Sequence, residues 1–386
     1  VSSTTNKLLP FLPLPLVQIL LGIVIGLFLP NTDFHLNTEL FLALVIGPLL
    51  FRESEEADIT AILKHWRIIV YLIFPVIFIS TLSLGGLAHL LWFSLPLAAC
   101  LAVGAALGPT DLVAFASLSE RFSFPKRVSN ILKGEGLLND ASGLVAFQVA
   151  LTAWTTGVFS LGQASSSLIF SILGGFLIGF LTAMTNRFLH SFLLSVRATD
   201  IASELLLELS LPLVTFFLAE EVHVSGIIAV VVAGILKASR FKKITLLEAQ
   251  VDTVTETVWH TVNFMLNGSV FVILGMELEM IAEPILTNPI YNPLLLLLSL
   301  VALTFVLFAI RFVMIYGYYA YRTRRLKKKL NKYMKDMLLL TFSGVKGTVS
   351  IATILLIPSN LEQEYPLLLF LVAGVTPVSY THLTLP

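Results

Sequence analysis

Long apolar runs separated by short polar segments dominate this sequence. There are twelve of them, at residues 11–30, 38–51, 67–91, 94–119, 131–157, 167–190, 203–218, 222–236, 258–280, 293–320, 336–357 and 365–378. Most are near the length of about 20 residues that a helix needs to cross the apolar part of a bilayer. They lack the apolar–polar alternation of a membrane β-barrel, so the pattern predicts an all-α polytopic membrane protein.

The composition points to the same class. Only 12% of the residues are charged, 56% are hydrophobic, and the mean hydropathy is +0.91. Soluble domains carry about 25% charged residues, so a soluble fold is excluded. The single cysteine, Cys100, leaves no disulfide framework and no cysteine-based metal cluster within the chain. We predict no cofactor and no nucleic-acid partner.

Basic residues gather on one side of the predicted topology, although the net charge is zero. The segment 321–335 is the most basic, and with alternating spans it shares its side with 121–127, 187–197 and 237–243. Lys and Arg favour the cytoplasmic side, so 321–335 is predicted to be a cytoplasmic loop at the plasma membrane. A second interpretation is that this loop binds anionic lipid or regulates activity. No Lys or Arg occurs in the opposite loops, at 31–37, 92–94, 158–166, 219–221, 281–292 and 358–364.

Both ends of the sequence depart from this pattern. Val1 leads within a few residues into the first complete span, so we expect a further helix before it. Residues 376–386 interrupt an apolar run and resemble a translated sequencing adapter. They are set aside here as a non-native tail.

The most informative polar residues lie together in the fifth span. Residues 134–144 read Gly-Glu-Gly-Leu-Leu-Asn-Asp-Ala-Ser-Gly-Leu, which places Asp140 within an apolar run. An ionised side chain at bilayer depth costs at least about 2.5 kcal/mol, so such residues are usually functional. Glu135 and Asn139 are four residues apart and share a helix face, with Asp140 one step further round. We predict that Asp140 binds protons or ions, and that Asn139 either shares the site or bridges two helices.

Two spans carry helix-breaking residues beside a charge. Residues 107–112 read Leu-Gly-Pro-Thr-Asp-Leu, and proline removes a backbone donor and clashes with the preceding turn. Residues 343–348 read Ser-Gly-Val-Lys-Gly-Thr, with Lys346 between two glycines. Two crossed broken helices with charged ends frame the ion site of many transporters. The breaks lie seven spans apart, which fits two inverted repeats of six helices and one linking helix, thirteen in all.

Other charges in or near the spans receive structural interpretations. Arg311 is assigned to helix packing or snorkelling, and Glu204 and Glu208 to the membrane interface. Asp111 either joins the ion site or satisfies the backbone of the broken helix. Glu135 is interpreted as a partner in a structural ion pair.

The ordered motifs resemble the sodium/proton antiporters of the first monovalent cation:proton antiporter family. The resemblance rests on residues 108–111 followed by 134–140, on 342–349 as a second broken helix, and on 219–226 and 271–278. Its specificity lies in the order of these motifs, and it extends over about residues 8–375.

The resemblance implies a thirteen-helix fold within a single transporter domain, residues 1–378. A mobile core would comprise about residues 94–157 and 293–378, around the crossed broken helices. The remaining helices would form a scaffold through which two copies make a homodimer in the lipid membrane.

The resemblance also implies roles for individual residues. Asp140 would bind the transported Na⁺ and the proton in turn. Thr110 would offer oxygen to the ion, with Asp111 beside it, and Asn139 would tie the fifth span to the break at Thr110.

Three positions depart from the family pattern. Gly136 stands where the family usually has Ser, which removes one hydroxyl ligand. Lys346 stands where Arg is commoner, although it would still pair with Glu135; a lysine is a point charge whose pKa shifts readily on burial. Arg52 lies near the position at which some members carry an acidic site residue, so that role is not transferred.

We therefore predict a secondary active transporter, not an enzyme, that exchanges Na⁺ or Li⁺ for H⁺ by alternating access in pH and sodium homeostasis. Burial raises the pKa of a carboxyl group and a nearby cation lowers it, so proton and cation compete for one carboxylate. A single titrating group in the pair Asn139–Asp140 favours electroneutral exchange. Release of a proton from Lys346 during the cycle would make exchange electrogenic.

Three alternatives remain open. The nearest is a sister antiporter that exchanges K⁺ or another monovalent cation for protons. A passive channel is disfavoured because the sequence has no filter-like repeat. A remote alternative is an intramembrane hydrolase with Asp111 and Asp140 as its dyad, but the Gly-x-Gly-Asp run usual in such enzymes is missing.

Overall fold

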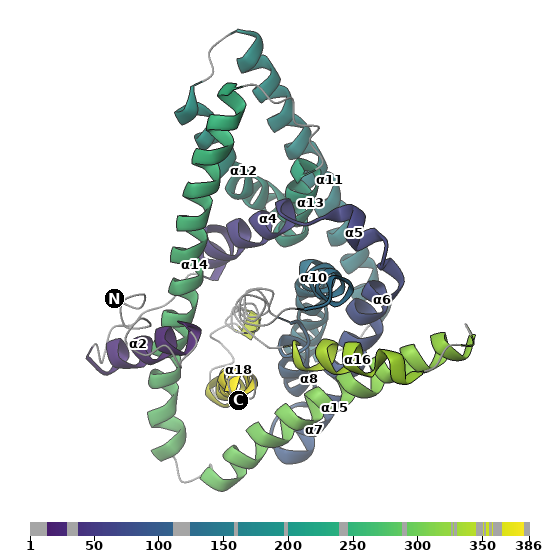
Figure 1. Cartoon of the computed structure of the whole chain (residues 1–386). Coiled ribbons are helices and arrows are strands. Elements are labelled where there is room, and N and C mark those ends of the chain that lie inside the picture. Colours follow the sequence, from purple (N-terminus) through teal and green to yellow (C-terminus); the bar gives the residue numbers. More distant parts are fainter. Residues whose placement is uncertain are drawn as a thin grey trace. The chain divides into compact units, whose positions relative to one another are not determined.

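A computed structural model of the chain describes residues 14–28, 38–110, 124–157, 161–196, 200–238, 246–287, 292–325, 327, 330–344, 350, 353–354, 357 and 365–381. The described residues form helices joined by short turns, with no strand among them (Figure 1). The predicted all-α class is confirmed. Contacts divide the chain into two compact units: residues 1–33, 60–159 and 271–386 form unit 1, and residues 34–59 and 160–270 form unit 2.

Unit 1 contains most of the predicted core. Its helices are α2 (Leu14–Phe28), α6 (Trp66–Tyr71), α7 (Ile77–Leu91), α8 (Leu97–Ala106), α10 (Lys126–Thr156), α15 (Pro293–Arg325), α16 (Met334–Phe342) and α18 (Tyr365–Thr381). A π-helical segment, Leu72–Val76, joins α6 to α7, and a short 3₁₀ turn, Leu330–Tyr333, precedes α16. The division of the chain into a mobile core and a dimerising scaffold stays a prediction.

Unit 2 is assembled from the second span and spans six to nine. Its helices are α3 (Thr38–Phe41), α4 (Gly47–Glu55), α11 (Leu161–Ser195), α12 (Ile201–Glu221) and α13 (Gly226–Ala238), with the π-helical segment Leu42–Ile46 between α3 and α4. Two helices belong partly to each unit: α5 (Ile59–Leu63) and the long α14 (Leu246–Thr287). Each of the twelve predicted spans coincides with at least one of the helices in the two units.

Several described helices have the length and composition of membrane spans. The segments Trp66–Leu91, Ile169–Leu193, Ile201–Glu221 and Pro293–Arg325 meet both conditions. Along α11, Phe170, Leu173, Phe176 and Leu177 are all exposed. A helix that is apolar on its exposed face is expected in contact with lipid rather than water.

Helices α8 and α16 end at the two positions where helix breaks were predicted. Helix α8 ends at Ala106, and the N–H of Gly108 donates to the carbonyl of Ala105 (3.1 Å), after which the chain leaves the helix. Helix α16 ends at Phe342, and the N–H of Gly344 donates to the carbonyl of Thr341 (3.3 Å). The continuations at 111–123 and 345–349 lie outside the described residues, and so does any crossing of the two helices.

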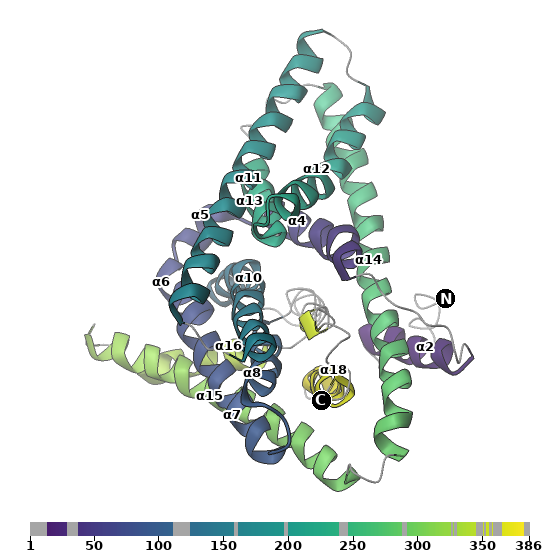
Figure 2. The same ribbon diagram turned by 180° about the vertical axis from the view of Figure 1, so that it is seen from behind.

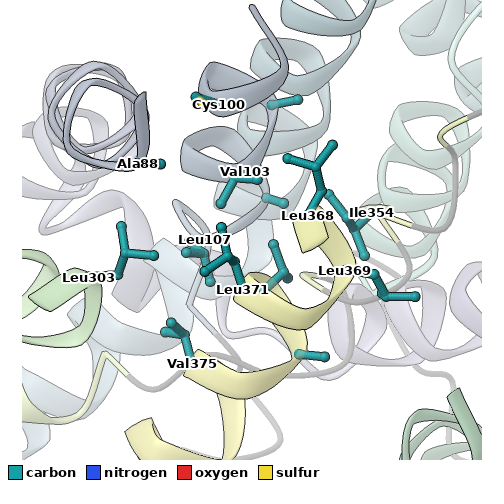
Figure 3. Packing of buried hydrophobic residues seen from close by; sticks show 14 of the residues in the cluster. Ala88, Cys100, Val103, Leu107, Leu303, Ile354, Leu368, Leu369, Leu371 and Val375 are labelled. Carbon is teal, nitrogen blue, oxygen red and sulfur yellow. The ribbon is translucent and has the colours of Figure 1, made fainter. Parts of the chain in front are cut away.

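The core of unit 1 surrounds the first of these breaks. Helix α8 packs against α7 and α10 (Figure 1 and Figure 2). Leu107 at its end lies in one apolar cluster with Leu303 of α15 and Leu371 of α18, as Figure 3 shows. Cys100 is buried in the same cluster, which fits its interpretation as a core residue. The end of α8 is therefore held by well-packed neighbours on α7, α10, α15 and α18.

Two predicted boundaries need correction. The segment 321–335 was expected to be a loop, but α15 continues through Arg325 and α16 begins at Met334. Arginine is a good helix former, and basic residues at a helix C-terminus interact favourably with the helix dipole. Helix α18 also continues to Thr381, past the predicted end of the last span at residue 378. The non-native origin of 376–386 stays a prediction.

Candidate cation-binding site

The candidate site of unit 1 is built on one face of α10. Glu135 and Asn139 lie one helical turn apart on this helix, and both side chains are buried, at 2% and 0% exposure. Facing them is Thr110, at the point where the chain leaves α8, with 5% exposure. The structure thus brings together three of the sequence-predicted site residues from two separate spans.

Asn139 holds the broken segment through two hydrogen bonds. Its side-chain Nδ2 donates to the Thr110 hydroxyl oxygen at 2.6 Å and to the Thr110 backbone carbonyl at 3.3 Å. A backbone carbonyl can only accept, so the amide nitrogen of Asn139 must face Thr110. The amide oxygen, Oδ1, then points the other way, and it is buried without a hydrogen-bond partner among the described residues. A buried carbonyl oxygen without a donor is free to bind a cation.

Thr110 connects Asn139 to a buried ion pair. Its hydroxyl donates to Glu135 Oε1 at 3.3 Å. Glu135 in turn accepts two parallel hydrogen bonds from Arg311 of α15, from Nη1 to Oε1 at 2.6 Å and from Nη2 to Oε2 at 2.8 Å. This is the bidentate geometry in which guanidinium and carboxylate bind each other most strongly.

Arg311 also fixes the end of the second interrupted helix. Its Nε donates to the backbone carbonyl of Leu340 at 3.0 Å, near the C-terminus of α16. Gly344 packs directly on the guanidinium, because a Cβ atom at that position would lie 2.7 Å from Arg311 Cζ. The ends of both interrupted helices are therefore joined to α10 through Glu135 and Arg311.

A close helix approach sets the position of Thr110. Gly143 lies one turn beyond Asn139 on α10, and a Cβ atom there would lie 2.7 Å from Pro109 Cδ. Only glycine allows α10 and the residue before Thr110 to come this near. Ser142 adds a further tie, since its hydroxyl lies 3.3 Å from the carbonyl of Ile73 in the π-helical segment.

Comparison with known proteins agrees with this architecture. The model of the family described as "Sodium/hydrogen exchanger, transmembrane" matches residues 2–384. The chain belongs to the sodium/hydrogen exchanger family. The predicted resemblance to the family of sodium/proton antiporters is therefore confirmed.

Two curated relatives and one solved structure illustrate the similarity. The sodium, potassium, lithium and rubidium/H⁺ antiporter of Bacillus subtilis is 36% identical over 383 residues, covering 97% of this chain and 57% of the relative. The antiporter of the same name from Bacillus pumilus is 35% identical, with 97% and 57% covered. The chain thus spans little more than half the length of these relatives. The structure of the sodium proton antiporter MjNhaP1 from Methanocaldococcus jannaschii has a TM-score of 0.69 at 18% identity, covering 98% of this chain and 91% of that one.

Three predicted site residues, Asp140, Asp111 and Lys346, have side chains outside the described part of the structure. Asp140 follows Asn139 in α10, but its side chain lies outside the described residues, and Asp111 and Lys346 lie outside them altogether. The expected pairing of Glu135 with Lys346 is therefore untested. Within the described parts of the chain, no group of three or more His, Cys, Asp or Glu side chains could hold a resident metal ion.

Of the two interpretations of Arg311, helix packing agrees with the structure and snorkelling does not. Its side chain is only 4% exposed and joins α15 to α10 by binding Glu135, a partner that the sequence did not predict for it. The available signal was its position inside the apolar run 293–320, where a buried cation needs an anionic partner.

Glu204 and Glu208 also have partners in unit 2. Glu204 lies 3.2 Å from His190 Nε2, and Glu208 contacts Lys237 and accepts a hydrogen bond from Trp259 at 3.3 Å. Both residues form interhelical contacts, and their assignment to the membrane interface stays a prediction.

Arg52 does not belong to this unit-1 site. It lies in unit 2 on α4, where it forms salt bridges with Glu55 at 2.9 Å and with Glu56 at 2.6 Å. The structure therefore gives no reason to assign to Arg52 the site role that was withheld on sequence grounds.

Proposed function

We propose that this chain exchanges Na⁺ or Li⁺ for H⁺ across the plasma membrane by alternating access, with Asp140 as the shared binding group. The observation that carries the proposal is the buried contact between Thr110 and Asn139, the residue before Asp140 in α10, which leaves the Oδ1 of Asn139 without a partner among the described residues. Hard oxygen ligands of this kind favour small alkali cations over soft metals.

One carboxylate is sufficient for the exchange chemistry. A buried carboxyl group tends to stay protonated, and an arriving cation favours its ionised form. Proton and cation then compete for Asp140, and each leaves only when the other can replace it. Thr110 and the Oδ1 of Asn139 would complete the coordination of the cation, and Asp111 is a further candidate ligand in this proposal.

The Glu135–Arg311 pair supports the proposed stoichiometry. Glu135 would otherwise be a second buried carboxylate competing for the cation, but both of its oxygens already accept hydrogen bonds from the Arg311 guanidinium. Asp140 then remains the titrating member of the site, so one proton exchanges for one monovalent cation without net charge movement. Lys346 has a supporting role in this proposal, as a second cation near Glu135.

Gly136 and the names of the relatives both suggest which alkali cations this chain would transport. The names of both Bacillus relatives include potassium, lithium and rubidium beside sodium. A glycine at 136 supplies no hydroxyl, and a site with fewer side-chain ligands imposes less demand on ion size. We therefore extend the proposal to K⁺ and Rb⁺ as weaker substrates. Such a transporter would serve pH and sodium homeostasis as a homodimer, with its Lys- and Arg-rich segments in the cytoplasm.

The proposal is tested with the full chain reconstituted in proteoliposomes that have an acidic interior and contain a pH-sensitive dye. External Na⁺ or Li⁺ should raise the internal pH, and K⁺ or Rb⁺ should do so at higher concentration. A voltage-sensitive dye should show no signal during exchange driven by Na⁺. No response to any alkali cation would overturn the proposed function, and a robust voltage signal would overturn electroneutrality.

A further inference from the structure

A basic cavity lies in unit 1, away from the residues of the candidate site. Its volume is about 630 Å³, and it is bounded by residues 64–68 at the start of α6 and by residues from 318 to 325 at the end of α15. These are the terminal turns of two helices that have the length and composition of membrane spans, Trp66–Leu91 and Pro293–Arg325. The cavity therefore lies at the depth where a span meets the polar region of a bilayer.

Four cationic side chains line this cavity: Lys64, Arg67, Arg322 and Arg325. The lining includes no Asp or Glu, and none of the four forms a salt bridge within the described part of the chain. The neighbouring acid Asp336 is already paired with Arg127 at 3.7 Å. Among the described residues, the positive charge of the cavity thus has no acidic counter-ion.

Burial and the positive charge of the cavity lower the pKa of His65, which also lines it. His65 lies in the cavity wall, and its pKa is lowered, first by burial and then by the charges of Arg127, Lys64 and Arg322. An anion bound in this cavity would offset the charges that act on His65.

The wall between the two helices is fixed by aromatic contacts. The rings of Tyr71 and Tyr318 lie 5.1 Å apart, and the Tyr71 hydroxyl donates to the carbonyl of Met314 at 3.2 Å. Arg67 lies over the ring of Trp66, with Cζ 5.6 Å from the ring centroid. The cations on α6 and on α15 are therefore held on opposite sides of one cavity.

An exposed apolar stripe leads away from the cavity along the same span. Trp66, Val70, Phe74 and Phe78 follow one another at intervals of four residues, and all four are exposed. Tyr321 lies at the cavity mouth with 68% exposure. Trp and Tyr are typical of the boundary between headgroups and acyl chains. A basic cavity that continues into an apolar stripe matches a molecule with an anionic head and an acyl chain.

We propose that this cavity binds the phosphate-bearing headgroup of an anionic phospholipid, with an acyl chain along Trp66, Val70 and Phe74. Arg67, Arg322 and Arg325 suit a phosphate because each guanidinium group can donate hydrogen bonds to two phosphate oxygens at once. A small soluble phosphate shares the headgroup chemistry but makes no use of the apolar stripe. The lipid would join the start of α6 to the end of α15, the helix that also carries Arg311.

Lipid binding is measured by native mass spectrometry on the full chain in detergent. Phosphatidylglycerol is compared with phosphatidylcholine of the same acyl chains. The test variant is R322Q/R325Q, and the matched control is R324Q/K335Q, which removes the same charge from exposed positions outside the cavity. We expect R322Q/R325Q to bind phosphatidylglycerol about 10- to 30-fold more weakly and the control to bind it almost as the parent does. Phosphatidylcholine binding should change in neither.

Two further measurements separate a cavity site from general charge attraction and from loss of folding. R322K/R325K keeps the positive charge but lacks the planar guanidinium groups, so its affinity for phosphatidylglycerol should lie between those of R322Q/R325Q and the parent. R325Q alone changes the exposed last residue of α15 and should weaken binding about fivefold without unfolding the chain. Equal losses in R322Q/R325Q and in R324Q/K335Q would overturn the proposal.

The phosphate source is tested by competition. Glycerol 3-phosphate and inorganic phosphate, at millimolar concentration, should leave the bound phosphatidylglycerol in place because they lack an acyl chain. Displacement of the lipid by either compound at a comparable concentration would overturn the lipid assignment in favour of a soluble phosphate ligand.

Discussion

Arg311 and Glu135 are joined by two parallel hydrogen bonds although 176 residues separate them in the sequence. Both side chains are almost completely buried. The pair connects α15 to α10, and through Thr110 and Leu340 it reaches the ends of both interrupted helices. It is therefore the structural support on which the proposed ion site depends.

Replacing Arg311 by glutamine should leave the Glu135 carboxylate buried without its counter-ion. Loss of one partner of a buried ion pair costs about 3–5 kcal/mol. We expect a clearly lower unfolding temperature in detergent. The decrease should be smaller for Arg311→Lys, which keeps the positive charge but cannot donate two parallel hydrogen bonds as a guanidinium does. The double variant Glu135→Gln with Arg311→Gln should lose less than the sum of the two single variants. Additive losses would show that the two side chains are not coupled.

Thr110→Val removes the hydroxyl while keeping the shape of the side chain, and Thr110→Ser keeps the hydroxyl. The valine variant loses the 2.6 Å bond from Asn139 and one proposed cation ligand. A hydrogen bond of this kind contributes about 0.5–1.5 kcal/mol, which corresponds to a rise in the KM for Na⁺ of about 2- to 12-fold. The serine variant should retain a KM near that of the parent. A KM that is equal for valine and serine would remove Thr110 from the site.

Gly143→Ala should impair transport although alanine is the better helix former. The added methyl group would collide with Pro109 and push the residue before Thr110 away from α10. The matched control is Gly86→Ala on α7, where an added Cβ meets nothing within 4 Å. Gly86→Ala should be at least as stable as the parent, because alanine is favoured in helices by about 1 kcal/mol. Equal transport rates in the two variants would contradict the close approach of α10 to Pro109.

Anion binding at the basic cavity should depend on pH through His65. Its pKa is lowered by burial and then by Arg127, Lys64 and Arg322, so a bound phosphate that offsets these charges should raise the pKa. By linkage, phosphatidylglycerol should bind more tightly as the pH falls from about 7 to 5, and its affinity should be constant at higher pH.

His65→Gln should remove most of this pH dependence while leaving the affinity at high pH unchanged. The cations that face His65 come from its own segment, from α10 and from α15. They are Lys64, Arg67, Arg127, Arg322 and Arg325. A pH profile that is the same in the variant and in the parent would assign the effect to another group.

The local sequence was enough to predict the helices and their interruptions. Proline at 109 cannot continue a helix, and the glycines around Lys346 weaken one, so the ends of α8 and α16 follow from covalent geometry. The shared face of Glu135 and Asn139 follows from the helical repeat. The contact between Asn139 and Thr110 came from the family resemblance, because spacing along the chain does not show which spans are neighbours.

The partner of Glu135 could not be predicted in the same way. Arg311 and Lys346 are both cations in the C-terminal spans, and the sequence does not say which of them packs against α10. The end of α15 was also misplaced, since the basic composition of 321–335 suggested a loop, whereas Arg322 and Arg325 belong to the last turn of a helix. The basic cavity depends on this helical extension, and it could not be predicted without it.

The central claim is that Asp140 carries both the cation and the proton. Its most direct test is Na⁺-driven proton efflux from acidic proteoliposomes that contain the parent chain, Asp140→Asn, or Glu256→Gln. The last is a control that neutralises an exposed carboxylate on α14. We expect Asp140→Asn to fold but to show no cation response, and Glu256→Gln to exchange at the parent rate. Full exchange activity in Asp140→Asn would contradict the proposed role of Asp140.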